Sequence, residues 1–182
     1  MVNLSGKTAL VTGASRGIGR ASALALAEGG AQVLVHYGHG KAEAESVVAE
    51  IRNGGGRAQA LGSDLSAPDG AHILARHVRD IVGDRLDVLV ANAGVAKSAK
   101  IEDTTVEDFD RLFAVNVRSP FFLIQRTLPI LGNGSSIVFI SSLGARAVVG
   151  ALRLTRRPWE RSTRWSNTLP QRLAHAEFGS MP

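Results

Sequence analysis

Thr12-Gly13-Ala14-Ser15-Arg16-Gly17-Ile18-Gly19 is the stretch that decides the fold of this 182-residue chain. It begins at the end of an apolar run, 8–12, that predicts a short buried strand, and it leads into an alanine-rich helical pattern, 16–28. The three glycines let the backbone turn tightly and approach a pyrophosphate. The following helix offers free N–H groups and the positive end of its dipole. A glycine-rich loop in this context predicts a dinucleotide-binding loop.

Apolar runs and helical patterns continue to alternate outward from this loop. The alternation favours parallel strands joined by right-handed crossovers, so we predict an α/β protein with a doubly wound parallel sheet, a Rossmann fold of three α/β/α layers. In such a sheet, ligands bind at the carboxyl ends of the strands. The predicted strands are 8–12, 32–36, 57–61, 86–91 and 136–141. Two of the predicted helices are 16–28 and 41–52, and a third has Pro68 in its first turn and runs to about Val82. The last helical segment is 106–131, in which Pro120 starts or kinks a second part.

Four further motifs accompany the glycine loop, namely Asp64-Leu65, Asn92-Ala93-Gly94, Asn116 within Phe113-Ala-Val-Asn-Val117, and Ile140-Ser141-Ser142. With these motifs in this order, residues 4 to about 150 resemble the short-chain dehydrogenase/reductase family of the short soluble type. The resemblance implies NAD(P)(H)-dependent oxidation or reduction of a carbonyl/alcohol pair in a small molecule. It also implies an assembly of identical subunits through the helices that flank the fifth strand.

The resemblance assigns roles to individual residues. It implies that Ser142, with Ser141 as its neighbour, is the serine that hydrogen-bonds the substrate oxygen, and that Asn116 supports the water of a proton relay. It implies cofactor contacts from Gly13, Ser15, Arg16, Gly17, Ile18, Gly19, His36, Asp64, Leu65, Asn92, Ala93 and Gly94.

Each of these residues also has a plainer interpretation. Asp64 could cap a loop, Asn92 could hold a turn beside Gly94, Asn116 could face solvent in mid-helix, and Ser142 could be an ordinary loop serine. The five histidines, at positions 36, 39, 72, 77 and 175, show no metal-ligand spacing, and we expect them at the surface or at strand ends.

The residues after the second predicted strand indicate which cofactor is preferred. An acid there would hold the ribose 2′-hydroxyl of NAD, but residues 36–41 contain none. The 2′-phosphate of NADP requires positive charge instead, which Arg16 and either Lys41 or His39 could supply. NADP(H) is therefore favoured, and NAD(H) remains the alternative.

The family's chemistry requires a tyrosine and a lysine four residues apart after the fifth strand, and this chain has Thr155 and Trp159 there. Its single tyrosine is Tyr37, so Tyr-x-x-x-Lys occurs nowhere. A threonine hydroxyl is too weak an acid to replace a phenol at neutral pH. We therefore expect that catalysis is lost. The alternatives are a non-catalytic dinucleotide-binding module and a non-functional product of a shifted reading frame.

The charge distribution divides the chain near residue 150, shortly before Thr155 and Trp159. Its net charge is +5, and residues 151–182 hold six arginines against two acids. We therefore predict two parts, a dinucleotide-binding Rossmann domain at 1–151 and an atypical basic tail at 152–182. The tail is either a divergent extension or an out-of-frame translation. The fold would then be incomplete at its C-terminal side, with an exposed edge at the fifth strand and a tendency to associate.

The remaining composition excludes several classes of protein. There are no cysteines, so a disulfide framework and a thiolate metal site are ruled out. The sequence lacks both a membrane-length apolar run and the apolar core of a signal peptide. The tail's arginines show no pattern typical of nucleic-acid binding. We expect a cytoplasmic protein with no membrane or nucleic-acid partner.

Overall fold

The computed structural model describes residues 3–97 and 101–142. In these ranges, parallel strands form one five-stranded sheet in the order β3-β2-β1-β4-β5. The chain builds outward from β1 to β3 and then crosses to the other side of β1, so the switch point lies between β1 and β4. The strands are β1 (Thr8–Val11), β2 (Gln32–Tyr37), β3 (Arg57–Gly62), β4 (Val88–Ala91) and β5 (Ser136–Phe139).

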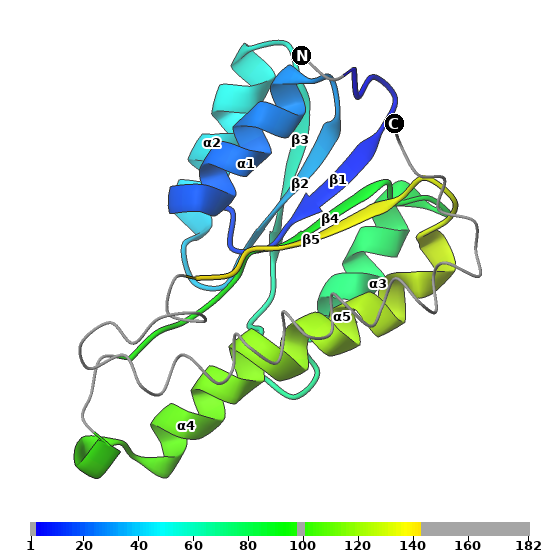
Figure 1. Cartoon of the computed structure of the whole chain (residues 1–182). Helices are drawn as coiled ribbons and strands as arrows, with labels where there is room; N and C mark the ends of the chain where they lie inside the picture. The colour runs from blue at the N-terminus through cyan, green and yellow to red at the C-terminus, as the bar shows by residue number, and fades with distance from the viewer. Residues whose placement is uncertain (1–2, 98–100, 143–182) are drawn as a thin grey trace.

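Helices cover both faces of this sheet, with α1 and α2 on one side and α3 and α5 on the other (Figure 1). The result is the three-layer Rossmann fold that the alternation of elements predicts. The helices are α1 (Gly17–Glu28), α2 (Lys41–Asn53), α3 (Gly70–Val82), α4 (Val106–Phe113) and α5 (Ser119–Thr127), with a π-helical turn η2 (Ala114–Arg118) and short 3-10 turns η1 (Ile101–Asp103) and η3 (Leu128–Ile130).

The two cores follow from the alternation of side chains along each strand. In β1, Leu10 belongs to the core beneath α3 and α5, whereas Ala9 and Val11 belong to the core beneath α1 and α2. In β2, Leu34 joins the first core in the same way. Every residue of β1 after Thr8 is completely buried, so this strand reads as one continuous apolar run in the sequence.

The predicted elements are all present, with small shifts at their ends. Helix α3 begins at Gly70, so Pro68 precedes it rather than lying in its first turn. The segment predicted as helix from 106 to 131 is divided into α4, the π-helical turn η2, α5 and η3, and Pro120 lies in the first turn of α5. Among the described residues, no helix has both the length and the apolar character needed to cross a membrane.

Candidate functional site

An open cleft of about 690 Å³ lies at the carboxyl ends of the strands, where ligands bind in open α/β sheets. Its volume is within the range of small-molecule and cofactor sites. The loops that follow β1, β2, β3 and β4 contribute to it, together with one side of α4 and η2. Its lining includes Gly13, Ser15, Arg16, Gly17, Ile18, His36, His39, Glu43, Asp64, Leu65, Asn92, Ala93, Gly94, Arg111 and Val115.

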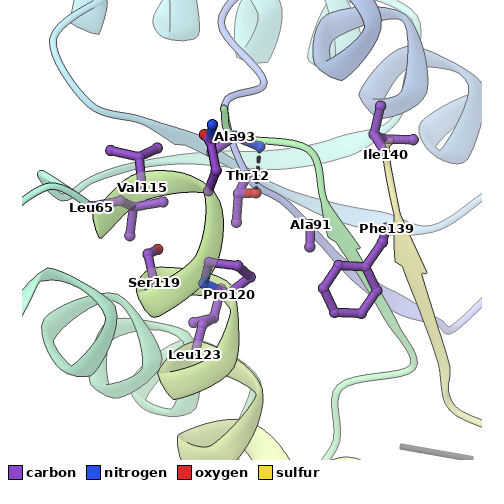
Figure 2. A pocket seen from close by; sticks show the side chains of 11 residues that line it. Thr12, Leu65, Ala91, Ala93, Val115, Ser119, Pro120, Leu123, Phe139 and Ile140 are labelled. Atoms are coloured by element: carbon purple, nitrogen blue, oxygen red, sulfur yellow. Dashed lines mark hydrogen bonds between the residues drawn. The ribbon is translucent and has the colours of Figure 1, made fainter. Parts of the chain in front are cut away.

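The glycine loop is held against the end of β4 by a compact set of hydrogen bonds. Asn92 Nδ2 donates to the carbonyl oxygens of Thr12 and Gly13, at 2.8 and 3.1 Å. Thr12 Oγ1 accepts from the N–H groups of Asn92 and Ala93, at 3.0 and 2.9 Å, and the second of these bonds is drawn in Figure 2. Asn92 therefore holds the glycine loop itself, which is more than fixing a turn beside Gly94.

The first turn of α1 is open toward the cleft. Its N-cap residue, Arg16, has an extended backbone and no side-chain capping bond, and the turn contains no acid. Gly17 has a φ of 56°, and a Cβ there would meet no atom within 4 Å. Since the first N–H groups of a helix have no partner within the helix, this turn presents donors and a positive dipole end to the cleft. Ile18 lies beside them and is largely exposed.

The loop after β2 presents a different set of charges from the predicted one. Arg16 and His39 line the cleft, as the NADP interpretation requires. Lys41 is not among the lining residues, and its ammonium lies 3.7 Å from Glu45 on the same helix. Its contribution of charge to a 2′-phosphate stays a prediction. The sequence reasoning also missed Glu43, an acid in the first turn of α2 that lines the same cleft.

His36 borders the cleft but is almost completely buried, with 1% of its surface exposed. Its Nδ1 accepts from the Gly13 N–H at 3.1 Å, and its Nε2 lies 3.0 Å from the Ser63 carbonyl oxygen. Burial lowers the pKa of His36 to about 4, against the opposing effect of the hydrogen bond to Ser63. The imidazole is therefore neutral near pH 7 and supplies no charge to a bound phosphate.

Asp64 and Leu65 follow β3, where the resemblance expects them to contact the cofactor. Asp64 Oδ1 accepts from the Ser66 hydroxyl at 2.7 Å and from the Ser66 N–H at 2.9 Å. These two bonds hold the pKa of Asp64 below its usual value. Asp64 thus caps its own loop, as the plainer interpretation states, and it also lines the cleft beside the buried Leu65.

Asn116 lies in η2 and is 3% exposed, so the solvent-facing alternative is wrong. Its Oδ1 accepts from the Val95 N–H at 2.9 Å, and its Nδ2 donates to the Val95 carbonyl oxygen at 2.8 Å. Asn116 therefore fixes the backbone just after Gly94, in the segment that closes one side of the cleft.

Between η2, α5 and the ends of β4 and β5 lies a small cavity of about 20 Å³ (Figure 2). Thr12, Ser119, Val115 and Phe139 are among its lining residues, and the buried hydroxyl of Ser119 has no hydrogen-bond partner. A cavity of this size holds about one water molecule.

Ser141 and Ser142 end the described part of the chain, just after β5, and neither lines the cleft. Thr155, Trp159 and the basic tail at 152–182 lie outside the described residues, so the structure does not bear on those predictions.

Arg111 and Val115 also line the cleft, and the sequence reasoning did not single them out. Their spacing of one helical turn, just before Asn116, is the signal that would have found them.

Among the described residues, no group of three or more histidine or acidic side chains is arranged so that it could hold a metal ion. His72 differs from the surface position expected for it. Its Nε2 is buried without a hydrogen-bond partner, and its ring packs edge-on against Phe122 at a centroid distance of 5.5 Å.

Comparisons with known proteins support the architecture and show the family. The family model described as short chain dehydrogenase matches residues 7–152. Versicolorin reductase 1 of Aspergillus parasiticus is 42% identical over 140 residues, which cover 76% of this chain and 53% of the relative. An uncharacterized oxidoreductase of Methylorubrum extorquens is 46% identical over 143 residues, covering 79% and 57%. The chain thus spans about half the length of these curated relatives.

Solved structures show the same likeness. The landomycin C-6 ketoreductase LanV, determined with bound NADP and rabelomycin, is 38% identical with a TM-score of 0.91, covering 96% of this chain and 74% of that one. A short-chain dehydrogenase from Burkholderia cenocepacia in complex with NADP is 35% identical with a TM-score of 0.91, covering 96% and 71%.

Proposed function

The chain belongs to the short-chain dehydrogenase family, and from this membership we propose that its cleft binds NADP(H). The chemistry of such a site is hydride transfer between the nicotinamide and a carbonyl/alcohol pair of a small molecule. We further propose that this chain binds the dinucleotide without turning substrate over, because it lacks the tyrosine and lysine of the proton transfer.

The observation that carries the proposal is the backbone of the glycine loop, which is packed closely at Gly13 and open at Gly17 beside the uncapped first turn of α1. A Cβ at Gly13 would lie 2.9 Å from Ala93 Cα, so the loop can pack this closely against β4 only with glycine there. Above Gly17 there is open space, and the unpartnered N–H groups of α1 border it. A site with no side chain over it and free donors beneath it suits an anion that the backbone approaches directly.

The preference for NADP(H) over NAD(H) rests on Arg16 and His39. Both line the cleft, and no acid occurs in residues 36–41 at the end of β2. A guanidinium suits a phosphate because it offers several donors in one plane. Glu43 opposes the preference, since its carboxylate lines the same cleft. The NADP complexes of two solved relatives add weight to Arg16 and His39.

In this proposal the glycine loop would hold NADP(H), which would supply hydride chemistry to the site. By the family resemblance Ser142 would hydrogen-bond a substrate oxygen, and Asn116 holds the backbone at Val95 in place. No side chain of suitable acidity stands at 155 to exchange the proton, because threonine replaces the phenol.

The cofactor proposal is tested by titrating the 182-residue chain with NADPH and NADH, following the dinucleotide fluorescence. We expect NADPH to bind at least tenfold more tightly than NADH, because only NADPH carries the 2′-phosphate. Arg16→Gln should weaken NADPH binding and leave NADH binding nearly unchanged. Arg76→Gln, on the exposed side of α3, is the matched control. Equal affinity for both dinucleotides, or no binding of either, would refute the assignment.

The loss of catalysis is tested by a carbonyl-reductase assay on the same preparation with NADPH and a panel of ketones. We expect no turnover above background, and measurable turnover would show that another residue transfers the proton.

The division into a dinucleotide-binding part at 1–151 and a basic tail at 152–182 is a separate proposal. The out-of-frame origin of the tail is tested by resequencing the coding DNA around codons 148–160, and an intact frame with no family-like sequence in the neighbouring frame would exclude it.

A further inference from the structure

His36 connects three parts of the cleft floor from a buried position at the end of β2. Its ring accepts the Gly13 N–H, and its own carbonyl oxygen accepts the next N–H, that of Ala14, at 2.8 Å. Two consecutive amides of the glycine loop are therefore bound to one residue. Because Asn92 holds the carbonyl oxygen of Gly13, that residue is fixed on both sides.

The other ring nitrogen extends the connection to β3 and α3. His36 Nε2 lies 3.0 Å from the Ser63 carbonyl oxygen, and Ser63 Oγ donates to the Gly70 carbonyl oxygen at 2.7 Å. Ser63 immediately precedes Asp64, and Gly70 begins α3. A single chain of hydrogen bonds thus runs from the glycine loop through the imidazole to the loop that follows β3.

These contacts permit one state of the ring. The Gly13 N–H can only donate, so Nδ1 must have its lone pair free, and the Ser63 carbonyl oxygen can only accept, so Nε2 must carry the hydrogen. A proton added at Nδ1 would place two N–H groups opposite each other and remove the acceptor of Gly13. The other tautomer would fail at both ends.

We propose that His36 is a positioning residue that holds the glycine loop only as the neutral, Nε2-protonated imidazole, so that acid releases the loop and weakens dinucleotide binding. The pH dependence rests on the proposed function, whereas the tautomer and its contacts do not. The residue acts through Gly13 and carries no charge to the cofactor.

None of the described titratable side chains of the elements around His36 is hydrogen-bonded to its ring, whose two contacts are with the backbone of Gly13 and Ser63. These side chains are Arg16 of the glycine loop, Tyr37 and His39 of β2 and the loop after it, Glu43 at the start of α2, and Asp64 after β3. Burial is the dominant cause of the lowered pKa of His36, and the only opposing contact is the backbone of Ser63.

The first experiment observes the imidazole directly, by ¹⁵N NMR of the histidine side chains in the full chain from pH 8 to about pH 3.5, below the pKa of about 4 for His36. We expect Nδ1 of His36 to show the shift of an unprotonated nitrogen and Nε2 that of a protonated one. The exposed His77 serves as the reference histidine in the same spectra. A protonated Nδ1 of His36 at neutral pH would overturn the proposal, whether or not the chain binds NADPH.

The second experiment measures NADPH affinity over the same pH range in the parent chain, His36→Asn and His77→Asn. We expect the parent chain to lose affinity as the His36 ring takes up its proton. His36→Asn should bind NADPH about tenfold more weakly at neutral pH, which corresponds to the loss of roughly one hydrogen bond. Its affinity should also lack the decrease in acid that protonation of the His36 ring causes in the parent chain. His77→Asn should behave as the parent.

An acid-dependent decrease that persists unchanged in His36→Asn would overturn the coupling. If the parent chain bound no NADPH at any pH, the proposed function would fail. The NMR signals of the ring nitrogens would still show which tautomer of His36 is present and whether Nδ1 is free to accept the Gly13 N–H. Should His36→Asn fail to fold, the NMR titration of the parent chain alone decides between the outcomes.

Discussion

At Gly19, the residue that ends the glycine loop, α1 comes so close to β4 that no side chain fits. A Cβ there would collide with Asn92 Nδ2 and with the Gly13 carbonyl oxygen. These two atoms are hydrogen-bonded to each other, so neither can move aside without breaking the bond that holds the loop. The glycine is required by packing here, since its backbone is in the ordinary helical range.

Gly19→Ala should therefore destabilise the fold and weaken the proposed binding of NADPH. We expect a loss of about 2 kcal/mol in the free energy of unfolding, the usual cost of overpacking, and a dinucleotide affinity at least tenfold weaker. Gly132→Ala is the control, because a Cβ there would meet only the end of the flexible Arg85 side chain, at 3.3 Å. Urea unfolding followed by circular dichroism measures both, and equal stability of the two variants would contradict the packing argument.

At the scale of elements, Asp87 connects the amino-terminal ends of the neighbouring strands β1 and β4, opposite the end of the sheet where the cleft lies. It immediately precedes β4. Its carboxylate accepts from the Thr8 N–H at 2.9 Å, from Arg85 Nε at 2.9 Å and from Lys7 Nζ at 3.1 Å. The side chain is 6% exposed, whereas both cations are partly in water. Burial acts to raise the pKa of Asp87, but these hydrogen bonds outweigh it and hold the pKa below its usual value. One carboxylate thus ties the beginnings of β1 and β4 together.

Asp87→Asn should lower the free energy of unfolding by about 2 kcal/mol at neutral pH, because two cations lose their partner and the Thr8 N–H loses a charged acceptor. Asp80→Asn, on the exposed side of α3, should change it by less than about 0.5 kcal/mol. Thermal or urea unfolding of both variants is the measurement. An Asp87→Asn protein as stable as the Asp80→Asn protein would show that the ion pairs contribute nothing net.

At the scale of the whole molecule, global stability should fall in acid. The pKa of His36 is 6.5 when unperturbed and about 4 in the folded chain, so between these values the unfolded chain binds more protons than the folded one. Stability is therefore complete above about pH 6.5 and decreases by about 3 kcal/mol as the pH falls to about 4. Below that range the stabilisation from Asp87 is lost as well, because a carboxylate with a lowered pKa stabilises only while ionised.

Urea unfolding at a series of pH values measures this curve. In His36→Asn the slope between about pH 6.5 and pH 4 should become much shallower, while the further loss below about pH 4 should remain. An unchanged slope in that variant would place the acid sensitivity elsewhere.

Among the described residues, part of the exposed apolar surface lies on α4, α5 and β5. Phe109 and Phe121 are each 43% exposed, and Val138 of β5 is exposed to the same degree. In the part of the chain that the structure describes, β5 is the last strand of its sheet. The tendency to associate that the sequence indicates stays a prediction.

The sequence by itself determined the element order, the parallel sheet and the position of the dinucleotide loop. These follow from local patterns, namely apolar runs, helical periodicity and the spacing of Gly13, Gly17 and Gly19, and local patterns are written directly in the chain. The absence of Tyr-x-x-x-Lys, on which the proposed loss of catalysis rests, is equally a fact of the sequence.

Only the tertiary structure decided what the site residues do, because their partners lie far away along the chain. Asn92 binds the glycine loop 79 residues before it, and His36 reaches Gly13 on one side and Ser63 on the other. The tertiary structure also shows that Arg16 and His39 line the cleft, whereas Lys41 pairs with an acid of its own helix. Sequence patterns indicate which residue types lie near a strand's end, but burial and hydrogen-bond geometry determine whether a side chain binds a ligand or holds the backbone that does.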